Sequence, residues 1–190
     1  MRRGRPVAPF RDKGDQFVTY PVYTGPPEVK IGGDVEEPTQ ALRYYRLALA
    51  QYTQSYEIRR GHYPGVNVAT LNLVIAAFSN DSGEREAKRQ TCKSVAGELL
   101  DRKHPWPNEH DDDEVWHAAS TGEIHLLQEQ WALSEQLYRN AQHNKKCHSF
   151  HRTSMLKQVI RITYCYKRLG VTSLGAFDEL TNVFPPDPSD

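Results

Sequence analysis

The densest group of residues that could do chemistry lies at positions 109–117. The chain reads Glu-His-Asp-Asp-Asp-Glu at 109–114, followed by His117, and carboxylates and imidazoles are good ligands for a divalent metal. Asp113 and His117 would share one face of a helix. The motif HExxH is absent, and an acidic run is typical of a solvated helix N-terminus. We expect no metal and no catalytic residue; a metal-binding protein or hydrolase built on this cluster is the alternative function.

The cysteines suggest a second kind of chemistry. There are three, far apart and without a CxxC pair: Cys92, Cys147 and Cys165. Such a set argues against a disulfide framework and a cysteine zinc site, and is typical of reduced thiols in the cytoplasm. Cys147 has Lys145, Lys146 and Arg152 nearby in sequence, and cations lower the pKa of a thiol. Cys147 is therefore a candidate redox thiol.

Two further groups could bind a protein partner. Lys157 and Arg161 recur at a helical step in a basic stretch, which suits an acidic peptide or a phosphate group on the partner. A solvated helix face is the alternative. Tyr63, Asn67 and Asn72 lie in or beside an apolar segment, where they could contact a partner or satisfy backbone groups between stacked helices.

Charge and hydropathy exclude several classes of protein. The 190 residues include 24 Lys plus Arg and 24 Asp plus Glu, so the formal net charge is zero. No global field attracts nucleic acid or an anionic membrane. The N-terminus lacks the apolar region of a secretory signal, and no apolar stretch is long enough to span a bilayer. We expect a cytoplasmic protein without cofactor, nucleic-acid or membrane partner; association of several copies stays possible.

The elements that must position these residues are helices. Residues 1–38 are rich in proline and glycine and are expected to form an irregular N-terminal arm, with one short strand possible at 16–23. Residues 39–184 form the folded domain, and 185–190 a disordered tail. Apolar residues at steps of three and four predict helices at 39–60, 82–100, 111–129, 132–142 and 149–169, with Ser82 as a cap and Gly170 as a C-terminal stop. A short helix follows at 172–183. Segment 64–78 fits a strand or a helix equally. If it is counted as a helix, the total is about seven helices.

Three residue trios suggest that these helices repeat in pairs. Ala41-Tyr45-Ala48 and Ser134-Tyr138-Ala141 have the small-aromatic-small spacing of the second helix in a tetratricopeptide unit, and Ala87-Thr91-Ser94 is a version without the aromatic. The trios begin 46 and 47 residues apart, longer than the standard repeat of about 34 residues. Gly122 lies twelve residues before Ser134, as the first-helix glycine does in that unit.

One nonapeptide resembles a known family. Residues 63–71, Tyr-Pro-Gly-Val-Asn-Val-Ala-Thr-Leu, are similar to the signature of the TRAF-binding, tetratricopeptide-like domain. That domain occurs in the regulatory region of apoptosis signal-regulating kinases, which are MAP kinase kinase kinases, and in bacterial repeat proteins. The resemblance covers about residues 39–170. It implies an all-α, tetratricopeptide-like solenoid of helical hairpins in which 64–78 is helical.

The same resemblance implies a function without catalysis. Such a domain is a protein–protein interaction module or scaffold in signalling, with a partner that the sequence does not identify. The chain has no glycine-rich loop followed by a lysine strand, no HRD and no DFG. Kinase activity is therefore not implied, and we expect the chain not to be an enzyme.

Overall fold

The computed structural model describes residues 38–59, 61–101 and 113–185. The predicted strand, the predicted arm apart from Pro38, and the predicted tail apart from Pro185 lie outside these ranges. Within them the chain forms seven α-helices, one 3-10 turn and no strand, which confirms the all-α prediction for this part. The elements are α1 Pro38–Arg59, α2 His62–Phe78, α3 Ser82–Asp101, α4 Asp113–Leu127, α5 Trp131–His143, α6 Ser149–Arg168, η1 Gly175–Asp178 and α7 Leu180–Val183.

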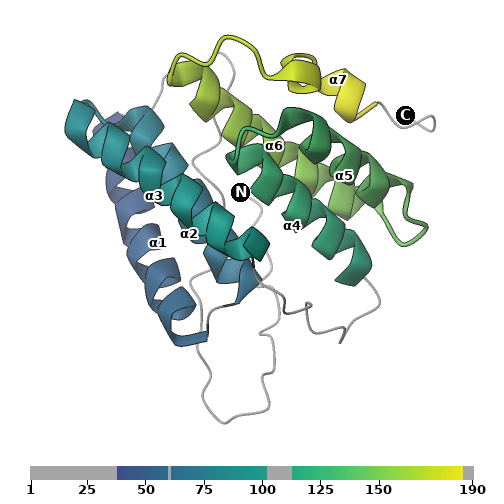
Figure 1. Cartoon of the computed structure of the whole chain (residues 1–190), viewed down its shortest axis with the longest axis horizontal. Coiled ribbons are helices and arrows are strands. Elements are labelled where there is room, and N and C mark those ends of the chain that lie inside the picture. Colours follow the sequence, from purple (N-terminus) through teal and green to yellow (C-terminus); the bar gives the residue numbers. More distant parts are fainter. Residues whose placement is uncertain (1–37, 60, 102–112, 186–190) are drawn as a thin grey trace, which may run out of the picture. The chain divides into compact units, whose positions relative to one another are not determined.

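Helix α2 forms the centre of the core. It is apolar on all sides, and residues from Gly65 to Ala77 are buried almost without a break. Four helices pack against it, namely α1, α3, α4 and α6 (Figure 1). An all-round apolar helix has no amphipathic period, which is why periodicity alone left this segment undecided. No helix in the described ranges is long and apolar enough to cross a membrane.

Helix α3 faces the core with a different set of residues from the one that the trio predicts. Its buried residues are Cys92, Ala96 and Leu99. The trio Ala87-Thr91-Ser94 is exposed along its whole length, and the Thr91 hydroxyl donates back to the Ala87 carbonyl at 2.9 Å. The prediction that this trio is the second of three repeat units is therefore wrong, because its small residues face solvent rather than another helix.

Helices α4 and α5 form a closely packed pair. Ser134, Tyr138 and Ala141 are all buried, and the Ser134 hydroxyl donates to the Gly122 carbonyl at 2.7 Å. A Cβ atom on Gly122 would lie 3.3 Å from the Tyr138 ring. The glycine thus lets the Tyr138 ring lie against α4, and the small-residue spacing noted in the sequence corresponds here to a real helix contact.

The C-terminal elements differ from prediction. Gly170 ends α6 as expected, with φ at 87°, and the Val171 N–H donates to the Tyr166 carbonyl at 3.0 Å. The single helix predicted at 172–183 is wrong: the chain forms η1 and the one-turn α7 instead. Gly175 has a φ of 61°, a left-handed conformation that cannot continue a right-handed helix. Both short elements pack against α5 (Figure 1).

Candidate functional site

An open groove of about 520 Å³ lies between α1 and α3. Successive turns of α1 form one wall, and two residues four apart on α3 form the other. The lining residues are Arg46, Leu49, Ala50, Thr53, Gln54 and Glu57 on α1, and Glu84 and Lys88 on α3. Leu49 belongs to the buried core, so the groove has an apolar patch beneath a polar rim.

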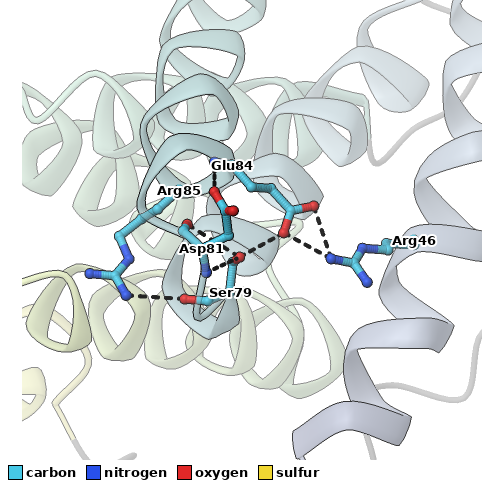
Figure 2. Close-up of polar contacts among 5 residues, drawn as sticks. All are labelled: Arg46, Ser79, Asp81, Glu84 and Arg85. Atoms are coloured by element: carbon cyan, nitrogen blue, oxygen red, sulfur yellow. Dashed lines mark hydrogen bonds and ion pairs between the residues drawn. The ribbon is translucent and has the colours of Figure 1, made fainter.

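A polar cluster at the turn between α2 and α3 fixes one side of this groove (Figure 2). The Glu84 N–H donates to Asp81 Oδ1 at 2.7 Å, so Asp81 rather than the predicted Ser82 caps α3. The Asp81 N–H in turn donates to the Ser79 hydroxyl at 3.1 Å. Because Ser79 satisfies that backbone group, the Glu84 side chain is not needed for a capping box and can turn toward α1.

Glu84 joins the cap to α1. Arg46 Nη2 donates to both carboxylate oxygens of Glu84, at 2.9 and 2.8 Å, and the Ser79 hydroxyl donates to Glu84 Oε2 at 2.6 Å. The Ser79 hydroxyl and, after it, the Arg46 guanidinium lower the pKa of Glu84. Glu84 therefore links the start of α3 to α1 along one side of the groove (Figure 2).

The side chains of the groove could pair with those of a bound peptide. Its charged residues balance, with Arg46 and Lys88 against Glu57 and Glu84. Thr53 and Gln54 add a hydroxyl and an amide that can pair with peptide groups. The six α1 residues span about 16 Å along the helix axis, which matches about five residues of an extended chain.

The predicted partner-binding residues on α2 divide into two kinds. Tyr63 is 63% exposed and lies edge-on to Tyr52, with ring centroids 6.2 Å apart. Asn67 is half-buried, and its amide donates to the Tyr63 carbonyl at 2.8 Å. Asn72 is only 2% exposed and donates to the Val68 carbonyl at 2.8 Å. The proposed partner contact of Asn72 is therefore wrong, because the core encloses this side chain.

Arg161 is half-buried at the edge of a polar network. Its Nη1 donates to Gln158 Oε1 at 2.9 Å. Gln158 Nε2 donates to Glu123 Oε1 at 2.6 Å, and the Thr70 hydroxyl donates to the same oxygen at 2.7 Å. Thr70, Glu123 and Gln158 come from α2, α4 and α6, so the network joins three helices. Lys157, by contrast, is exposed on α6.

Glu123 is the buried carboxyl of this network. Burial raises its pKa, and the hydrogen bonds from Gln158 and Thr70 and the charge of Arg161 oppose that rise only in part. These hydrogen bonds offset part of the free-energy cost of burying the Glu123 carboxyl, and the core encloses that carboxyl so that no partner can reach it. We regard the network as structural.

Cys147 does not have the lowered pKa that its neighbours in sequence predict. Partial burial raises the pKa of this thiol, and the charge of Arg152 offsets that effect only in part. Lys145 and Lys146 are exposed and do not reverse the shift. The expected activation is therefore wrong, and a redox role for Cys147 stays a prediction without that support.

The acidic cluster falls mostly outside the described ranges. Residues 109–112 are among those that the structure does not describe. Within the described part of the chain, no three His, Cys, Asp or Glu side chains lie close enough to hold a metal ion. The metal alternative for residues 109–117 therefore stays untested.

The groove residues were not predicted from sequence. Arg46, Thr53 and Glu57 look like ordinary solvent-facing residues of an amphipathic helix. Their partner wall on α3 begins with Glu84, and nothing in one sequence pairs these two stripes. The one local signal is the Asp-x-x-Glu pattern at 81–84, which is typical of a helix start.

Comparisons with known proteins find no match for this chain. No model of a known protein family matches the chain. No curated protein matches it either, nor does any solved structure.

Proposed function

We propose that this chain is a non-catalytic protein–protein interaction module that holds an extended segment of a partner in the α1–α3 groove. The observation that carries the proposal is the groove itself, an open space of about 520 Å³ with balanced charges on its walls. Its length suits about five extended residues. The Arg46–Glu84 ion pair, with an N–O distance of 2.8 Å, links the two walls without a partner, and a site formed in advance lowers the entropic cost of binding.

We further propose that the helices form a tetratricopeptide-like stack of the TRAF-binding type. The packing of Gly122 against Tyr138 in the α4–α5 pair supports this, as does the resemblance of residues 63–71. The proposed stack is irregular, since the trio on α3 is exposed and α2 also packs against α6. A stack of helix pairs presents extended surfaces that suit protein binding, and a scaffold role in signalling follows by analogy with the family. The three free cysteines support a cytoplasmic location.

Site-directed photo-crosslinking tests the groove. Thr53 is replaced by p-benzoylphenylalanine, a photoreactive residue, in the full chain, which is irradiated in an extract of the source cells. We expect one discrete crosslinked protein. Ala50→Trp, which fills the groove from its exposed wall, should abolish that product.

Two controls make the result specific. Ala132 is exposed on α5, so Ala132→Trp adds the same bulk elsewhere and should leave the product unchanged. Placing the photoreactive residue at the exposed Thr172 should not capture the same protein. Capture of one protein from both positions, or a product that survives Ala50→Trp, contradicts binding in the groove.

A further inference from the structure

Helix α6 has an unusual charge composition. Between Ser149 and Arg168 it contains five cationic residues, Arg152, Lys157, Arg161, Lys167 and Arg168, and no Asp or Glu. The whole chain has a formal net charge of zero, so this helix concentrates positive charge locally. Lys167 pairs with Asp178 of the following 3-10 turn at 3.6 Å. Even so, the helix keeps a net positive charge, which attracts an oppositely charged partner.

The solvent-facing side of α6 also has apolar residues at its centre. Met155, Val159 and Ile162 turn inward and are buried. On the opposite side lie Ile160 and Tyr164, which are 45% and 46% exposed and one helical turn apart. Together with Lys157, Lys167 and Arg168, which are exposed on the same side, they form what we call the α6 face. An apolar centre within a charged rim is the usual anatomy of a protein interface.

The end of α2 extends this surface. The Phe78 and Tyr164 rings lie with centroids 6.1 Å apart, and the Arg168 guanidinium lies 4.8 Å from the centroid of the Phe78 ring. Arg168 Nε also donates to the Ala77 carbonyl at 2.7 Å. Arg168 is therefore held in place over an aromatic ring, and Tyr and Arg are the residue types that most often dominate binding energy.

We propose that the α6 face binds a short acidic segment of a partner protein, with aliphatic or aromatic side chains between its carboxylates. The apolar side chains would cover Ile160 and Tyr164, and the carboxylates would pair with Lys157 and Arg168. A second copy that docks through its own α6 face is a poor occupant, because the two faces would bring like charges together. This inference rests on the proposed protein-binding function and adds a second surface with a defined partner chemistry.

Fluorescence anisotropy with a defined probe tests the proposal. The probe is a short labelled peptide in which glutamates alternate with leucine and phenylalanine, so that an extended chain presents its apolar residues on one side. We expect saturable binding to the full chain that weakens as salt is added. Two peptides serve as controls, one with glutamine for each glutamate and one with serine for each apolar residue, and both should bind at least about tenfold more weakly.

Protein variants locate the binding. Ile160→Ser and Lys157→Glu should each lower the affinity for the probe peptide by about fivefold or more, as expected for residues central to an interface. Ile58→Ser, on an isoleucine that is 73% exposed on α1, and Lys145→Glu, on an exposed lysine before α6, are the matched controls and should change binding by less than about twofold. Amide chemical shifts should change at 157–168, and all four variants should keep the circular dichroism spectrum of the parent chain.

Several results would overturn the inference. Absence of saturable binding of the glutamate peptide is one, and equal binding of the glutamine peptide is another. Anionic vesicles or duplex RNA that bind more tightly than the peptide, with loss on Lys157→Glu but not on Ile160→Ser, would assign the face to phosphate groups instead. The crosslinking experiment at Thr53 is independent of the peptide-binding experiment. Failure of peptide binding therefore does not contradict the groove proposal, and failure of crosslinking does not contradict the proposal for the α6 face.

Discussion

At the scale of single residues, Glu123 shows how burial sets the pH dependence of stability. Its pKa is raised above the ordinary 4.5 by burial. A group with a raised folded pKa gives its full stabilisation below the unfolded pKa and loses it as the pH rises through the folded pKa. Glu123 therefore contributes less to the stability of the fold at neutral pH, where its carboxyl is charged, than at acid pH, where the carboxyl is protonated.

Glu123→Gln should remove this dependence. Glutamine can keep both hydrogen bonds, since Thr70 and Gln158 donate to the same oxygen, Oε1. We expect the variant to be more stable than the parent at pH 8 by on the order of 1 kcal/mol, and equal to it near pH 4. Urea unfolding at several pH values measures the difference. A variant that is less stable at pH 8 would mean that attraction to Arg161 outweighs the cost of burial.

The thiols should react in an order that their burial sets. Burial raises the pKa of Cys92 and of Cys165 to about 12, so at a given pH their thiolate fractions are about a thousandfold lower than that of an ordinary thiol. Cys147 is only half-buried. Alkylation of the folded chain at pH 8, followed by peptide mass analysis, should label Cys147 first. Cys147→Ser should remove the fast phase, and early labelling of Cys92 would contradict the enclosed core.

At the scale of elements, two helical glycines should respond oppositely to alanine. A Cβ on Gly65 would lie 2.6 Å from Tyr56 on α1 and 2.8 Å from Leu99 on α3, whereas one on Gly97 meets nothing nearer than 3.5 Å. Gly65→Ala should therefore cost about 1–3 kcal/mol through overpacking. Gly97→Ala should stabilise by about 0.5–1 kcal/mol, the usual gain for alanine within a helix.

Chemical denaturation distinguishes these two effects. The urea midpoint should fall for Gly65→Ala and rise for Gly97→Ala, with an unchanged slope in both. A higher midpoint for Gly65→Ala would mean that α1 and α3 do not pack tightly against the start of α2 at Gly65. That outcome would also remove the structural reason for a glycine within the Tyr-Pro-Gly segment.

The elements themselves were largely predictable, whereas their details were not. Spacing of three and four identified α6, where Met155, Val159 and Ile162 are indeed buried. It also located α3 at Ser82–Asp101, but it did not identify the inward face of that helix, because Ala87 and Thr91 fit the same period as Val95 and Leu99 yet are exposed. Small residues are compatible with either face, so a pattern that relies on them does not determine which side turns inward.

The candidate site was hardly predictable at all. Asn72 attracted notice as a polar residue in an apolar segment, yet it bonds to its own helix. The groove depends on contacts such as Arg46 with Glu84, which are 38 residues apart in the chain. Exposed charged residues are common on any helix, and only the packing of α1 and α3 around α2 brings these two together.

At the scale of the whole molecule, the contacts of α2 determine how cooperatively the described helices unfold. In a simple solenoid each unit touches only its neighbours, and parts of it can unfold separately. Here α2 is packed by α1 and α3 and also by α4 and α6. The Thr70–Glu123–Gln158 network and the bond from Arg168 to the Ala77 carbonyl add polar links between α2 and the later helices. We therefore expect the described helices to unfold as one cooperative unit.

Leu73→Ala tests this cooperativity. Leu73 is fully buried in α2, and its truncation should cost about 2–5 kcal/mol. In a Trp106→Phe background, tryptophan fluorescence reports α4 and α5 through Trp116 and Trp131, while circular dichroism reports all helices. Both urea transitions should coincide before the change and shift together after it, as two-state unfolding requires. If the fluorescence transition stayed in place while part of the dichroism transition moved, α4 and α5 would be stable without α2, and the molecule would behave as a stack of separate helix pairs.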